Sequence, residues 1–136
     1  MTPTIRAGLR SLGAVIAGFA VIALGTVFTF TVLVDDFGYS TSGPIDLMIG
    51  TVGALASGIA GGVVAARLAS RKPLWHAAAL LVPIALDTAS IVASAGPESD
   101  PLWFDLGGSA ILWAGALVGG YWVAKRYVRE ASVPDT

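Results

Sequence analysis

The sequence contains no cysteine and only one histidine, His76. The missing thiols exclude disulfide exchange, thiol catalysis and cysteine-ligated metals, and one imidazole is too few for a histidine metal site or a bis-histidine haem. Charged residues make up only 12% of the chain, whereas soluble domains carry about 25%. The eight Lys and Arg residues are too scattered to form a surface that binds nucleic acid. We therefore expect no metal, no cofactor and no nucleic-acid partner.

Apolar residues are abundant instead: they fill 55% of the 136 positions, with a mean hydropathy of +0.78. They form four stretches, each close to the roughly 20 residues that a helix needs to cross a bilayer. The predicted spans are 11–34, 45–66, 74–95 and 102–124. We expect a single all-α integral membrane domain with four antiparallel transmembrane helices, a short polar lead, an interruption at Pro83 and a disordered tail at 130–136. A cleaved signal peptide is a weaker alternative for the first stretch, because its apolar part would span only about 7–15 residues.

The charges are divided between the two ends of the predicted bundle. Basic residues lie before the first span, between the second and third, and after the fourth, whereas the other two connections carry acids only. The positive-inside rule places the basic end in the cytoplasm. We therefore predict a multi-pass protein of the plasma (inner) membrane with both termini cytoplasmic and the basic residues against the anionic surface of the lipid bilayer.

Small residues recur at every fourth position in the second span and form two adjacent stripes. Such residues let a neighbouring backbone approach closely, which is how helices associate in lipid. A glycine pair recurs 58 positions later, so a tandem duplication of a helical hairpin and simple convergence both remain open. The predicted helix-packing residues are Gly50, Gly53, Ser57, Gly58, Gly61, Gly62, Gly119 and Gly120. Periodicity does not distinguish packing within the chain from packing in a homo-oligomer or against another membrane protein.

Asp87 is the one carboxylic acid away from the ends of the predicted spans. At 1.5 Å per residue it lies about 20 Å from the start of its helix, about two thirds of the way across the bilayer. A carboxylate at that depth is costly and by default indicates a functional site. Thr26, Thr51 and Ser109 fall at a similar depth, and together these four residues form a candidate ligand- or proton-binding site. The alternative is structural: the aspartic acid could join helices by hydrogen bonds, beside the carbonyl of Ala79 that Pro83 leaves without a donor.

Other polar and aromatic residues have simpler interpretations. His76 is a candidate pH sensor because imidazole changes charge near neutrality, although a histidine at the membrane interface is more often an anchor or a loop contact. Asp46 and Asp105 open the second and fourth spans, where capping is a sufficient explanation. Trp113 lies in mid-span and is interpreted as a bulky lipid-facing or packing residue. Four aromatics near the span ends fit the aromatic belt: Trp75, Trp103, Tyr121 and Trp122.

One segment resembles a known group of proteins. Residues 61–77, Gly-Gly-Val-Val-Ala-Ala-Arg-Leu-Ala-Ser-Arg-Lys-Pro-Leu-Trp-His-Ala, combine a glycine pair, ARLA, a basic pair, proline and HA. Arg10-Ser11, Ala17-Gly18-Phe19 and the late glycine pair fit the same pattern. On these residues the chain resembles an uncharacterised family of small bacterial four-helix integral membrane proteins over residues 10–127. It lacks the proline-rich outer loop and the Trp-Tyr before the fourth helix of that group. The resemblance implies the fold and no activity.

Two functions remain, and neither is enzymatic, because the sequence shows no nucleophile–base pair, metal cluster or phosphate loop. The first is an accessory or scaffold subunit whose glycine stripes dock onto partner helices. The second is a small proton-coupled or cation transporter in which Asp87 is the binding group.

Overall fold

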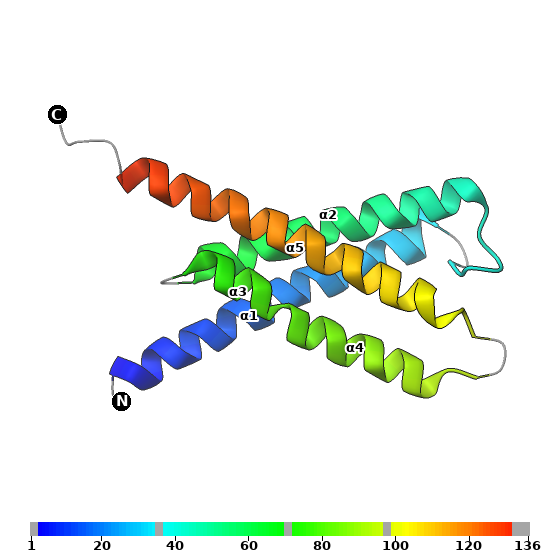
Figure 1. The fold of residues 1–136 in the computed structure, drawn as a ribbon, viewed down its shortest axis with the longest axis horizontal. Helices are drawn as coiled ribbons and strands as arrows, with labels where there is room; N and C mark the ends of the chain where they lie inside the picture. The colour runs from blue at the N-terminus through cyan, green and yellow to red at the C-terminus, as the bar shows by residue number, and fades with distance from the viewer. Residues whose placement is uncertain (1–2, 35–36, 70–71, 97–98, 132–136) are drawn as a thin grey trace.

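The computed structural model describes residues 3–34, 37–69, 72–96 and 99–131, and these residues form helices joined by short connections (Figure 1). The elements are α1 (Pro3–Phe28), the π-helical turn η1 (Thr29–Leu33), α2 (Pro44–Leu68), α3 (Pro73–Ala79), α4 (Leu81–Ser94) and α5 (Leu102–Ala131). With η1 continuing α1 and α4 continuing α3, they make four rods that are long and apolar enough to cross a membrane. The predicted all-α, four-helix membrane fold is confirmed.

Two helices are longer than the predicted spans. The supposed polar lead is helical from Pro3, and α5 continues to Ala131, so Glu130 belongs to a helix and not to a disordered tail. Residues 132–136 lie outside the described part. Hydropathy marks only the stretch in contact with lipid, whereas Ala, Leu, Lys, Arg and Glu favour a helix beyond that stretch as well.

The third rod is broken where proline predicted an interruption. It consists of α3 and α4, with Leu80 between them donating its backbone N–H to Ala77 in a tight turn at 3.2 Å. The indole Nε1 of Trp113 donates to the carbonyl oxygen of Ala78 at 3.1 Å. Trp113 is interpreted from the sequence as a residue that only fills space. In the structure its indole N–H is also a hydrogen-bond donor beside the helix break that Pro83 causes.

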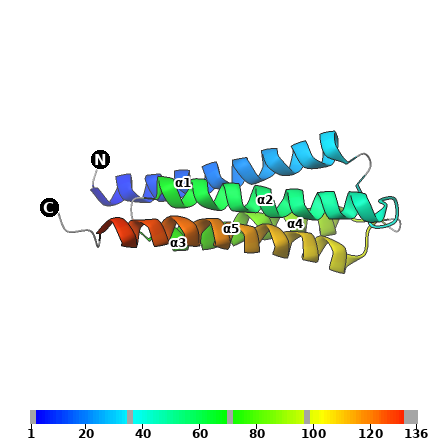
Figure 2. The ribbon, with the colours of Figure 1, turned by 90° about the horizontal axis from the view of Figure 1, so that it is seen from above.

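α2 lies between α1 and α5 (Figure 2), and its two small-residue stripes face these two different neighbours. The first stripe contains Gly50, Gly58 and Gly62. A Cβ on Gly58 would meet Leu112 and Gly115, and one on Gly62 would meet the backbone of Ala116, all on α5. The second stripe contains Gly53, Ser57 and Gly61, of which Gly53 abuts Thr29 and Gly61 abuts the carbonyl oxygen of Gly18. The two stripes therefore allow the backbones of α1 and α5 to approach α2 closely.

Glycines on the neighbouring helices complete these contacts. Gly25 of α1 faces Ser57, and Gly119 of α5 faces Ile59 of α2. Gly120, the next residue, faces Ala77 of α3. In a tandem duplication Gly119 would correspond to Gly61, which faces the preceding helix α1. Gly119 would then face the helix before its own, α3, but it is Gly120 that does so. The glycine pairs therefore have exchanged packing roles, which favours convergence over duplication.

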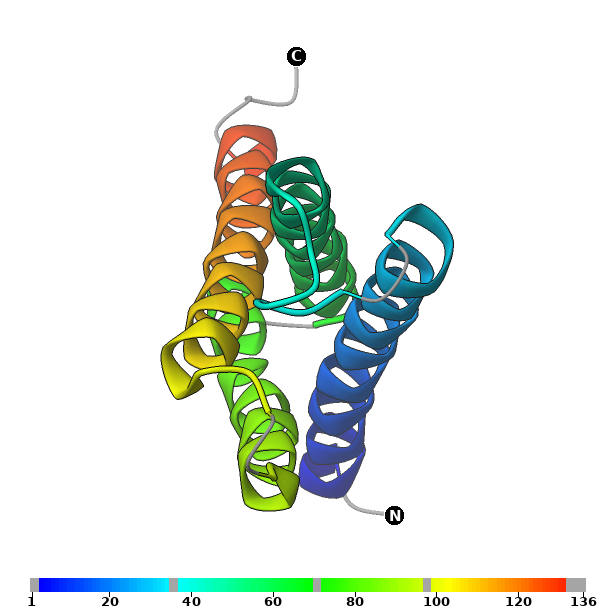
Figure 3. The ribbon, with the colours of Figure 1, turned by 90° about the vertical axis from the view of Figure 1, so that its right-hand side faces the viewer.

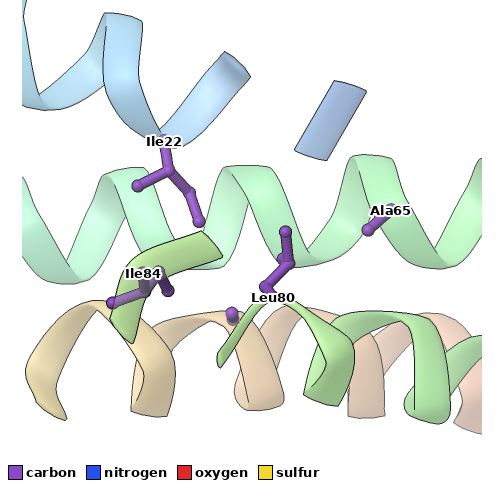
Figure 4. Close-up of a cluster of buried hydrophobic side chains, with 5 residues drawn as sticks. Ile22, Ala65, Leu80 and Ile84 are labelled. Carbon is purple, nitrogen blue, oxygen red and sulfur yellow. The ribbon is translucent and has the colours of Figure 1, made fainter. Parts of the chain in front are cut away.

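The tightest core lies at the level of the α3–α4 break. Leu80 and Ala116 are fully buried there, with Ile22, Ala65 and Ile84 around them (Figure 4). Because α1, α2, α4 and α5 all contribute a side chain, this cluster closes the centre of the bundle. The cluster forms the floor of the space described next. The half of the bundle that carries the termini is named the inner half, and the other half is named the outer half.

Candidate functional site: an acidic cavity in the outer half of the bundle

A cavity of about 690 Å³ lies between α1, α2, α4 and α5 on the side of the core away from the termini. Its floor is formed by Phe19, Ile22, Ile84 and Leu112, which belong to or pack against the central core. Its other end is covered by the loop 37–43, which runs towards α5 before the chain enters α2 (Figure 3). The space exists because α4 contacts mainly α5 and makes no comparable contact with α1 or α2.

All four residues predicted as a site line this one cavity. Thr26 comes from α1, Thr51 from α2, Asp87 from α4 and Ser109 from α5. The four residues are predicted from their depth along the helices alone, and in the structure all four line the same cavity. Thr88 also lines the cavity, and its hydroxyl bonds to that of Ser109, which links α4 to α5.

The hydroxyl protons in the cavity are already used within the protein. Thr26 donates to the carbonyl oxygen of Ile22 at 2.8 Å, and Thr51 donates to that of Leu47 at 2.7 Å. Thr88 and Ser109 have two hydroxyl protons between them. These are taken up by the contact between the two hydroxyls and by the carbonyl oxygens of Ile84 and Asp105 one turn back. Each hydroxyl has a single proton but two acceptor lone pairs. At this level the cavity therefore presents oxygen acceptors to whatever enters it.

The charges in the cavity have one sign. Its described lining includes Asp87, Asp100 and Asp105 and contains no Lys, Arg or His. Asp100 is engaged, because its Oδ1 accepts the backbone N–H of Tyr39 at 2.8 Å. Asp87 is exposed, and no hydrogen bond or ion pair to its carboxylate is found among the residues that the structure describes. A membrane carboxylate without a protein partner leaves its pairing to a proton, water or a cationic ligand.

An aromatic cluster closes the outer end of the cavity. Phe30 of η1 stacks on Phe37 of the loop with ring centroids 4.3 Å apart, and Phe37 lies 5.7 Å from Phe104 of α5. Tyr39 meets Trp103 edge-on at 5.0 Å. All five rings line the cavity. Of these residues, only Trp103 is predicted from the sequence to have a role, in the aromatic belt. The signal for the cluster is the pair Phe37 and Tyr39 inside the short acidic connection.

The cavity opens sideways between α1 and α4. Val27 and Ile91 line it from these two helices and are 59% and 52% exposed. Neighbouring Leu86 is 67% exposed on the same helix as Asp87. Since the floor is packed and the outer end is bridged by aromatic rings, the exposed flank offers an approach to the cavity. In a membrane that flank faces lipid.

The remaining predicted residues lie elsewhere or have other roles. His76 places Nδ1 3.1 Å from the carbonyl oxygen of Lys72 and so makes a local contact at the start of α3. Asp46 caps α2 as predicted, accepting the backbone N–H of Gly43 at 3.2 Å. Asp105 lies in the first turn of α5, but within the described residues its carboxylate accepts no capping hydrogen bond and lines the cavity instead.

The fold and this site define a multi-pass four-helix membrane protein with an acidic, largely apolar cavity in one half of its bundle. No family model, no curated protein and no solved structure matches the chain. The resemblance to small bacterial four-helix membrane proteins therefore stays a prediction.

Proposed function

We propose that the protein is a small, non-enzymatic cation carrier and that the cavity between α1, α2, α4 and α5 is its binding site. One observation carries the proposal: the cavity combines several carboxylates, hydroxyl oxygens whose protons are used elsewhere, and no basic residue in its described lining. Such a lining attracts a proton or a cation and repels an anion. Asp87 is the central group because its carboxylate has no partner within the described structure and, unlike Asp105 in the first turn of α5, it lies in the middle of a helix.

The accessory-subunit hypothesis remains a prediction, but it has lost the surface on which it rested. Gly58, Gly61 and Gly62 are buried against α1 and α5 of the same chain. These stripes cannot dock a partner without first separating from their own neighbours. A partner or a second copy would have to use another face.

We further propose that the termini and the connection between α2 and α3 lie in the cytoplasm, in the plasma membrane of a bacterium. This orientation follows from the basic residues at that end of the bundle. It places the cavity in the half of the membrane away from the cytoplasm. The chain lacks cysteine, so single cysteines report the orientation: Ser40→Cys should react with an impermeant maleimide in intact cells, and Ser70→Cys only after lysis. The reverse pattern would invert the topology.

The carrier proposal is tested by flux into proteoliposomes that contain the purified full chain. A membrane potential and a proton gradient are imposed, and entry of protons, Na⁺, K⁺ and the aromatic cation ethidium is followed. Asp87→Asn should abolish the flux of the transported cation, whereas Asp46→Asn makes the same chemical change outside the cavity and should leave it unchanged. If no cation shows a flux that depends on Asp87, the carrier proposal is wrong.

A further inference from the structure

The cavity has two chemically different ends. Its deeper part contains Asp87 and the threonine and serine oxygens, and its outer part is walled by the five aromatic rings. A ligand that satisfies both ends needs a positive centre and apolar groups. We propose that the occupant is a lipophilic organic cation, with its charge beside Asp87 and its apolar groups against Phe30, Phe37 and Trp103. This inference rests on the proposed function and names its substrate class.

The size of the cavity favours such a molecule over a bare ion. A volume of about 690 Å³ lies within the roughly 300–1,000 Å³ that small-molecule sites occupy. A dehydrated metal ion would instead require several oxygen ligands close together, and no group of three acidic or histidine side chains that could hold a metal is found among the described residues. A cation also interacts favourably with aromatic faces. Volume, charge and ring content therefore point to one class of ligand.

The direction of access agrees with this class. The exposed flank between α1 and α4 is lined by Val27 and Ile91, and in a bilayer it is bounded by lipid chains. A hydrophilic ion would have to cross hydrocarbon to reach it, at a cost of many kcal/mol. A lipophilic cation already partitions into the membrane and reaches the flank by lateral diffusion.

The test compares two ions of the same shape and opposite charge. The full chain in lipid nanodiscs is dialysed against labelled tetraphenylphosphonium or tetraphenylborate, and binding to empty nanodiscs is subtracted. We expect saturable binding of the phosphonium and none of the borate. Asp87→Asn should weaken phosphonium binding about tenfold or more, because an amide cannot form an ion pair with the cation as a carboxylate can. Asp46→Asn, outside the cavity, should bind as the unsubstituted protein does.

A second variant tests the cavity without altering charge. A Cβ at Gly108, which lines the cavity on α5, would meet nothing within 4 Å. Gly108→Leu therefore places a side chain in the empty space and should abolish phosphonium binding while the melting temperature is kept. Unchanged binding in this folded variant would overturn the location of the site.

The outcomes separate the substrate class from the carrier function. Equal binding of both ions, or unchanged phosphonium binding in Asp87→Asn, would overturn the inference, because charge would then not determine binding. If phosphonium fails to bind but proton, Na⁺ or K⁺ flux still depends on Asp87, only the substrate class is wrong. If neither binding nor any flux depends on Asp87, both proposals fail.

Discussion

The sharpest prediction concerns two glycines that receive the same single methyl group. Gly62 of α2 lies against the backbone of α5: an added Cβ would overlap the carbonyl oxygen of Ala116 and lie 2.6 Å from its Cα and 2.7 Å from its carbonyl carbon. Gly108 of α5 faces the cavity, where an added Cβ has no neighbour within 4 Å. Gly62→Ala and Gly108→Ala therefore differ almost entirely in what the new methyl group meets.

The expected difference in stability follows from these contacts. Overpacking a core usually costs about 1–3 kcal/mol, and Gly62→Ala should fall at or above about 3 kcal/mol, because backbone atoms cannot rotate aside and α2 must separate from α5. Gly108→Ala creates no overlap, and in a helix alanine is favoured over glycine by up to about 1 kcal/mol. Gly62→Ala receives the same propensity gain, so the two variants should differ by the overpacking cost alone, about 3 kcal/mol or more in the free energy of unfolding.

The measurement is thermal unfolding in a mild detergent, followed by tryptophan fluorescence and by loss of the monodisperse peak in size-exclusion chromatography. Gly62→Ala should melt far below the unsubstituted protein, and Gly108→Ala at or slightly above it. Equal melting temperatures for Gly62→Ala and the unsubstituted protein would refute the close α2–α5 contact, and with it the assignment of the first stripe to contacts within the chain.

Three further changes test the core and the links between helices, each by melting temperature in the same detergent. Leu80→Ala should destabilise the protein by about 2–4 kcal/mol because its side chain is fully buried, whereas its exposed neighbour changes little in Leu81→Ala; similar losses would contradict the central core. Trp113→Phe removes the indole donor beside the helix break and should cost about 1 kcal/mol; no loss would show that the bond contributes nothing. Thr88→Val removes the hydroxyl link between α4 and α5 and should cost about 0.6 kcal/mol, and a loss of several kcal/mol would mean that α4 depends on this one bond.

The helical class and the role of α2 were predictable because both depend on local pattern. Apolar length sets the spans, and small residues at every fourth position mark faces for close packing. The partner of each face was not predictable, since a glycine accepts any helix that approaches. That one stripe meets α1 and the other α5 depends on the arrangement of the whole bundle. Residues such as Gly58 and Gly61 show this, because they differ by less than one turn and contact different helices.

The candidate site was predictable in depth but not in composition. The rise of 1.5 Å per residue places Asp87, Thr26 and Ser109 at one level whatever the helix packing, and the structure brings them to one cavity. The aromatic wall could not be found in this way, because Phe37 lies in a connection whose path depends on contacts 61 residues apart, such as that between Tyr39 and Asp100. Local pattern predicts helices and levels, and only the folded chain determines which loop covers them.

Glycine has opposite effects along α5, and the contrast agrees with the position of the cavity. Towards the C-terminal end of this helix, a Cβ on Gly115 or Gly119 would meet the backbone of α2 at Leu55 and Ile59. In the outer half Gly107 and Gly108 line the cavity and meet nothing within 4 Å. An unfilled apolar space forfeits dispersion contacts on its walls, so any apolar occupant that fits will stabilise the folded state by mass action. A cationic occupant also pairs with the Asp87 carboxylate, which has no partner within the described structure. The same ligand therefore compensates for the lost dispersion contacts and for the unpaired carboxylate.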